Sequence, residues 1–251
     1  MNRSRNHSVA HHVLTRILKS GGDTLWTYPD FNNLEMTSVA AALSRLHRAG
    51  KLQRIRRGIY YYPKMTAFGE SKPNPEEVVD AIFRASKIST MEGGSTSYNR
   101  LGITTQISGA IHRVADRRVH LSSILNVPVR IEVRSHDSIV GITPEERGFL
   151  DALRNLTRIP DTTPGAVLER LGHHLKSKTV SFERLVRYAR KEPPRVRALL
   201  GALGDSVLNT DSKCINFKSL DKLRSTLNPL TTYKLKGAAR SLTPNAYWRL
   251  A

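Results

Sequence analysis

Cysteine, acidic residues and long apolar runs are all scarce in this sequence. Its 251 residues include a single cysteine, Cys214, so no internal disulfide can form, and one thiol fits a reducing compartment. No stretch approaches the roughly 20 apolar residues that a membrane-spanning helix needs. The first residues, MNRSRNHSVAHH, also lack the apolar centre of a secretory signal. These features predict a soluble protein of the cytoplasm.

The residue patterns that carry catalysis or bind metals are missing as well. The histidine pairs at 11–12 and 173–174 are adjacent in sequence, and neighbours on a helix point about 100° apart, so each pair is a poor set of metal ligands. No Cys/His spacing resembles a zinc site. The GGST stretch at 93–96 has neither the Gly-Lys-Ser/Thr of a P-loop nor the three glycines of a dinucleotide fingerprint. We therefore expect no metal, no cofactor and no enzymatic activity.

What the sequence has in excess is positive charge. Forty Lys and Arg face 21 Asp and Glu, which gives a net charge of +19. Residues 1–72 hold 12 basic and 4 acidic residues, a difference of +8, and residues 73–251 hold 28 and 17, a difference of +11. Such an excess causes self-repulsion in the folded state and is typical of proteins that bind polyanions or acidic partners.

The N-terminal third predicts a small DNA-binding fold. Residues 8–20 have helical apolar spacing, and residues 24–31 read as a short strand broken by Pro29. Asp30 is expected to cap a short helix at 31–34, and Thr37 or Ser38 a longer helix that ends near Ala49. Two extended pieces, 51–56 and 59–62, flank a turn at Arg57-Gly58. This order predicts a winged helix-turn-helix domain over residues 1–67.

The rest of the chain predicts a different domain. The polar, proline-containing stretch 68–75 reads as a linker, and residues 76–251 follow as one C-terminal domain. Its first half predicts a small sheet, and its second half predicts helices at 144–157, 164–175, 181–191 and 194–204. The sheet strands are expected at 110–114, 118–122 and 129–134, with helices at 75–87 and within 93–102. The fold class is therefore α+β: a winged helix-turn-helix followed by a mixed α/β region with a mainly helical C-terminal part.

The helix that begins near residue 37 has the two faces expected of a recognition helix. Val39, Leu43 and Leu46 fall on one side, as a core-facing stripe. The opposite side is small at its N-terminal end and basic at its C-terminal end, which suits close entry into the major groove. The residues expected to contact DNA from this helix and its end are Thr37, Ser38, Ala41, Ser44, Arg45, Arg48 and Lys51.

The hairpin that follows adds more basic residues. Arg54, Arg56 and Arg57 are expected to lie on neighbouring phosphates or in the minor groove. Of the three tyrosines 60–62, one or two should pack beneath the recognition helix. The alternative is a solvated basic hairpin on a domain that binds no nucleic acid, because winged helices also serve as protein-docking modules.

A second group of basic residues lies near the C-terminal helices. It could form another polyanion-binding surface, or it could be a solvated helix face. Its members are Arg184, Arg187, Arg190, Lys191, Arg195 and Arg197.

Three stretches of the chain resemble the AbiEi family of antitoxins from type IV toxin–antitoxin systems, in its branch with a short winged-helix head. They are LSRLHRAGKLQRIRRGIYYYPK (43–64), GGSTSYNRLGITTQISGAIHRVADRRVHL (93–121), and LVRYARKEPPRVRALLGALG (185–204) with the later LNPLTTYKLKG and LTPNAYW. The resemblance covers most of residues 8–250. It departs in the tail, where TTYKLKG is more basic than the family pattern.

The resemblance implies a division of labour. The head would bind inverted repeats of double-stranded DNA in the operon's own promoter and repress it. The remainder would neutralise a cognate nucleotidyltransferase-like toxin, without needing a stable complex. The family's recognition helix and wing correspond to Thr37–Arg48 and Arg54–Arg57. Two alternatives stay open: a stand-alone winged-helix regulator with no toxin, and a basic RNA-binding protein.

Overall fold

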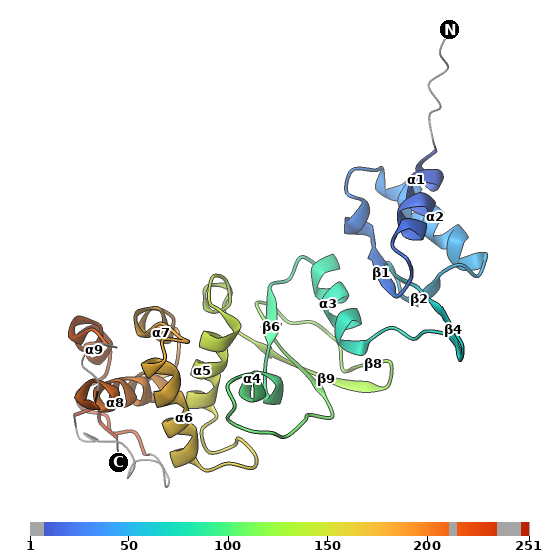
Figure 1. The fold of residues 1–251 in the computed structure, drawn as a ribbon. Coiled ribbons are helices and arrows are strands. Elements are labelled where there is room, and N and C mark those ends of the chain that lie inside the picture. Colours follow the sequence, from blue (N-terminus) through green and yellow to red (C-terminus); the bar gives the residue numbers. More distant parts are fainter. Residues whose placement is uncertain (1–7, 211–214, 235–246, 251) are drawn as a thin grey trace. The chain divides into compact units, whose positions relative to one another are not determined.

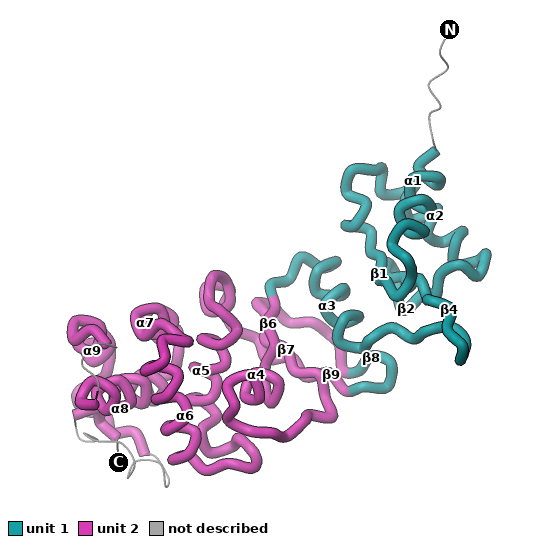
Figure 2. The backbone as a smooth tube through the Cα atoms, in the orientation of Figure 1, with its two compact units in different colours: residues 1–89, 123–127 teal, residues 90–122, 128–251 magenta. Residues whose placement is uncertain are grey.

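The computed structural model describes residues 8–210, 215–234 and 247–250 (Figure 1). Cys214 and the segment 235–246, which includes part of the basic tail, lie outside the described residues. The chain forms two compact units (Figure 2), and unit 1 consists of residues 1–89 with 123–127. Unit 2 consists of residues 90–122 and 128–251.

Unit 1 begins with the elements that the sequence predicts, in the predicted order. A three-stranded antiparallel sheet of order β1-β3-β2 packs with two helices and one 3-10 turn. The elements are α1 (Val9–Lys19), β1 (Thr24–Thr27), η1 (Tyr28–Phe31), α2 (Met36–Arg48), β2 (Gln53–Arg56) and β3 (Ile59–Tyr62). The short hairpin β4 (Met65–Thr66) and β5 (Gly69–Glu70) and the helix α3 (Pro75–Ala85) follow.

The core of this head is a single apolar cluster. Val13 and Ile17 of α1 meet Val39 and Leu43 of α2, and Trp26 stacks on Phe31 with ring centroids 5.3 Å apart. The apolar stripes of the two helices therefore pack α1 against α2.

Two details of the head differ from the prediction. Asp30 does not cap a helix at 31–34; it lies inside η1, and its Oδ2 accepts hydrogen bonds from the Thr27 amide (2.6 Å) and hydroxyl (2.7 Å). The expected linker 68–75 starts with β5, which pairs with β4 through the register Met65↔Glu70. The helix α3 contacts β1 and belongs to unit 1, which extends to residue 89.

Unit 2 begins with most of a small mixed sheet of order β6-β7-β9-β8. The short strand β8 of this sheet lies in the segment 123–127, which is assigned to unit 1. β7 runs antiparallel to β6 and parallel to β9. The elements are β6 (Thr90–Glu92), α4 (Ser95–Arg100), β7 (Ile111–Ala115), β8 (Ser123–Ile124), β9 (Val127–Val133) and η2 (His136–Ser138). The predicted strand at 118–122 does not form; β8 and β9 instead make a hairpin through Leu125 and Asn126, both at positive φ.

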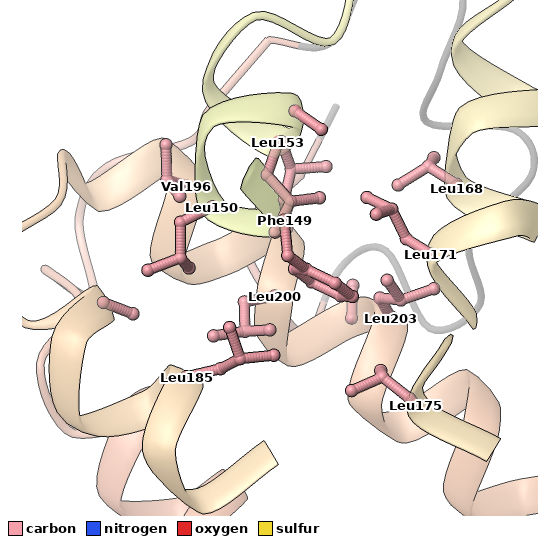
Figure 3. Close-up of a cluster of buried hydrophobic side chains, with 14 of the residues drawn as sticks. Phe149, Leu150, Leu153, Leu168, Leu171, Leu175, Leu185, Val196, Leu200 and Leu203 are labelled. Carbon is pink, nitrogen blue, oxygen red and sulfur yellow. The ribbon is translucent and has the colours of Figure 1, made fainter. Parts of the chain in front are cut away.

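Helices make up the second part of unit 2. They are α5 (Pro144–Arg154), α6 (Pro164–Lys176), α7 (Phe182–Ala189), α8 (Pro194–Thr210) and α9 (Phe217–Arg224). Thr143, Thr163 and Ser181 cap the first three through side-chain oxygens, which explains where these helices begin. α8 contacts the other four helices, and Figure 3 shows leucines from α5 to α8 converging on Phe149.

The last described segment packs on α8. Trp248 is fully buried, and its indole Nε1 donates a hydrogen bond to the Asp205 carboxylate. A Cβ at Gly201 would collide with the Trp248 ring, so the helix needs glycine there. No helix of the described residues is long and apolar enough to cross a membrane. The whole is a mixed fold of helices and small sheets, as the α+β prediction expects.

Candidate nucleic-acid interface

The outer side of α2 is formed by the residues that the sequence singled out. Val39, Ala42 and Leu43 are buried on the inner side. Thr37, Arg45 and Arg48 are exposed, and Ser38, Ala41 and Ser44 are half-buried. The helix therefore presents small residues near its start and cations near its end, as expected from the apolar spacing.

The start of α2 is built differently from the prediction. Neither Thr37 nor Ser38 is the N-cap; Glu35 is, and its carboxylate accepts from the amides of Thr37 (3.0 Å) and Ser38 (2.7 Å) and from the Thr37 hydroxyl. Hydrogen bonding from the side chains of Ser38 and Thr37, followed by that from their amides, lowers the pKa of Glu35 to about 2. Glu35 is thus ionised at neutral pH, and it is the one acidic residue between positions 31 and 69.

The hairpin of β2 and β3 carries the second group of cations. Arg54 and Arg56 are exposed on β2, and Arg57 is exposed at the turn. The register slips between Arg54, which pairs with Tyr60, and Arg56, which pairs with Ile59, so a bulge lies between the two arginines. Gly58 has a φ of +80°, and a Cβ there would meet the Tyr28 ring at 3.1 Å. The turn is therefore tight, and the Tyr28 ring packs against it.

Two of the three tyrosines of β3, Tyr60 and Tyr61, are buried in unit 1. Tyr60 belongs to the head core together with Leu43, and Tyr61 is 1% exposed. The Tyr61 hydroxyl donates to Asp23 Oδ1 at 2.7 Å, and burial raises the pKa of this phenol. The prediction that one or two tyrosines pack beneath the helix is confirmed by this core.

The six cations of this region form no ion pairs with described residues. The six, which we call the head cations, are Arg45, Arg48, Lys51, Arg54, Arg56 and Arg57, and all are exposed. Unpaired cations on adjoining elements can bind an anion without first breaking a salt bridge.

The six basic residues near the C-terminal helices have mixed surroundings. Arg184 pairs with Glu146 at 3.0 Å and donates to the Gly141 carbonyl at 2.7 Å. Arg197 donates to the Thr226 carbonyl at 2.8 Å. Lys191 lies 3.5 Å from Asp137, and Arg187 and Arg190 are exposed, whereas Arg195 is half-buried. Two members of this group, Arg184 and Arg197, are thus bonded to other segments of unit 2.

Sequence reasoning missed a buried ion network in unit 2. The Arg147 side chain, fully buried, contacts Asp151 Oδ1 at 2.7 Å and Glu192 Oε1 at 2.8 Å, and Arg154 reaches Glu192 Oε2 at 2.5 Å. Burial lowers the pKa of Arg147, but the two carboxylates outweigh it and raise this pKa overall. The i,i+4 spacing of Arg147 and Asp151 on a helix that also carries the apolar residues Phe149, Leu150 and Leu153 was the available signal. No cluster of three potential metal ligands occurs among the described residues.

Comparisons with known proteins found a family model that matches part of the chain and a solved structure with a similar fold. A protein family of unknown function, DUF6088, matches residues 16–121, which include the whole α2 and hairpin region. No curated protein matches the chain. Among solved structures, the chain is similar to the crystal structure of the RV2827C protein from Mycobacterium tuberculosis, with 16% identity and a TM-score of 0.50. That similarity covers 95% of this chain and 89% of the other, and at such low identity it shows the fold alone.

Proposed function

We propose that residues 8–62 form a winged helix-turn-helix that binds double-stranded DNA, and that the protein represses transcription. The observation that carries the proposal is the set of six exposed, unpaired head cations on α2 and the hairpin after it. The major groove is about 12 Å wide and admits one helix. The outer side of α2 would enter the groove, and the β2–β3 hairpin would lie on the flanking phosphates.

The target would be inverted repeats in the protein's own promoter. The support for autorepression, and for neutralisation of a nucleotidyltransferase-like toxin by the rest of the chain, is the resemblance to AbiEi antitoxins. A gene for such a toxin directly downstream, whose toxicity disappears on co-expression with this protein, is the expected result. Full toxicity on co-expression would leave a stand-alone regulator.

Specific DNA binding is tested first by a gel shift on the upstream intergenic DNA. Unrelated duplex of equal length and RNA serve as competitors. We expect the complex to survive both. Loss to any duplex would mean that the net charge of +19 acts only as a general polyanion binder, and preferential loss to RNA would identify RNA as the ligand.

The hairpin is tested by the triple change Arg54→Ala, Arg56→Ala and Arg57→Ala. Each lost phosphate contact reduces the slope of log K against log salt by about 0.9, so we expect a slope smaller by about 2 to 3 and weaker binding to all sequences. The matched control is Arg84→Ala, Lys87→Ala and Arg158→Ala, which removes three exposed cations outside this region. Binding by the hairpin variant that equals the control's would contradict the proposal.

A further inference from the structure

A hollow beside the candidate interface is lined by hydrogen-bond donors. It has a volume of about 510 Å³, within the range of roughly 300–1,000 Å³ typical of ligand sites. One wall is the outer face of α1, where the lining residues repeat at i, i+3, i+4 and i+7; the other is the turn that leads into α2. The lining includes His12, Thr15, Arg16 and Lys19 of α1, with Phe31 and Asn33.

The hollow is lined by cations, and one of them, Arg16, is held in place by aromatic rings. The Arg16 guanidinium lies 5.4 Å from the Phe31 ring centroid and 5.8 Å from that of Trp26, which holds it in a cation–π contact. Neither Arg16 nor Lys19 is ion-paired to a described residue, and no carboxylate is among the lining residues. A planar guanidinium, an ammonium, a hydroxyl and an amide are the donors that phosphate binding uses.

A simpler explanation accounts for part of this arrangement. Cations in the last turn of α1 stabilise the helix through its dipole. The dipole does not account for the hollow itself, for Asn33 facing it, or for an arginine fixed over two aromatic rings.

We propose that this hollow, the α1 pocket, binds a phosphate group. Asn33 lies two residues before Glu35, the N-cap of α2. If α2 enters the major groove by that end, the α1 pocket meets the DNA backbone that flanks the groove, and this source of phosphate rests on the proposed function. The second source is a free nucleotide, which does not depend on it.

The test uses the full chain with Arg16→Gln and Lys19→Gln. The control is Arg84→Gln and Lys87→Gln, which removes two exposed cations, one from the last turn of α3 and one just after it, in the same unit. Binding to duplex DNA is measured over a series of salt concentrations, and thermal unfolding is measured with and without ATP. Because Arg16 packs on aromatic rings, Lys19→Gln alone serves as a second variant that leaves this packing intact.

If DNA phosphate is the ligand, the salt slope of the pocket variant falls by about 1 to 2 relative to the control, on every sequence. If a free nucleotide is the ligand, ATP raises the melting temperature of the parent and the control but not of the pocket variant. Equal salt slopes together with equal ATP shifts would overturn the proposal. A failed hairpin test with a retained ATP effect would refute the proposed function while leaving the α1 pocket supported.

Discussion

At the residue scale, Gly201 is a position where packing leaves no room for a Cβ atom. It lies on α8 directly beneath the buried Trp248 ring. Gly201→Ala forces the indole out of place, and overpacking of this kind destabilises by about 1–3 kcal/mol. Urea unfolding followed by tryptophan fluorescence measures the loss.

The matched control for Gly201 is Gly165. It lies in the first turn of α6 with nothing within 4 Å of its ideal Cβ position. Alanine there should leave stability unchanged or raise it by about 0.5–1 kcal/mol, because alanine favours helix more than glycine does. Equal effects of the two substitutions would show that Trp248 does not occupy the site.

Glu192 should make the stability of unit 2 sensitive to acid. Burial raises its pKa, but Arg147 and Arg154 outweigh burial and lower this pKa overall. A lowered folded-state pKa means that the ionised form stabilises the fold above about pH 4.3, the ordinary value for Glu, and that this stabilisation is lost as the pH falls through the lowered pKa.

The measurement is the free energy of unfolding in urea at pH 7 and at steps below pH 4.3. Glu192→Gln should be clearly less stable than the parent at pH 7, and the difference should narrow as the pH falls. Glu169→Gln, at an exposed position, is the control. A difference between parent and Glu192→Gln that is independent of pH would contradict the assigned ion pairs.

At the scale of elements, α2 and the hairpin should contribute differently to DNA binding. Ser44 and Arg48 lie on the outer side of α2. Changing either to Ala should alter the preference among sequences, at about 1–3 kcal/mol for each good base contact. Selection from a randomised duplex library, compared between parent and variant, measures this. An unchanged consensus with uniformly weaker binding would assign both residues to phosphate contact.

The helices were predictable to a large extent because each carries its own local signals. The helix predicted over 164–175 is observed at Pro164–Lys176, with the apolar stripe, the proline and the threonine cap all in the sequence. Helix α2 was placed correctly but its cap was not, because glutamate is not among the favoured N-cap residues.

The sheets were less predictable because pairing is not a local property. Residues 118–122 alternate like a strand but form none, whereas Leu125 and Asn126 make a turn that no glycine signals. The parallel pairing of β7 with β9 depends on contacts between segments far apart in sequence. The buried ion network arises in the same way, since Glu192 meets Arg147 from 45 residues away.

At the scale of the whole molecule, the two units have separate cores. The buried cluster of the head lies within residues 13–60, and that of unit 2 begins at Tyr98. A fragment of residues 1–89 should therefore fold alone and bind DNA with the salt slope of the full chain. Circular dichroism and the gel shift check this.

The same fragment tests the second basic group. A slope clearly smaller than that of the full chain would assign DNA contacts to unit 2, with Arg187 and Arg190 as the exposed candidates. Failure of the fragment to fold would show that the head depends on the rest of the chain.

The packing of Trp248 on Gly201 also bears on the order in which the two cores can form during synthesis. Every apolar residue of the head core is translated before residue 61, whereas the cluster around α8 lacks its largest side chain until residue 248 has been added. Domains generally fold from the N-terminus as the chain emerges from the ribosome. The part of the protein that we propose to bind DNA could then fold on the nascent chain before Trp248, the largest side chain of the core of unit 2, has been added.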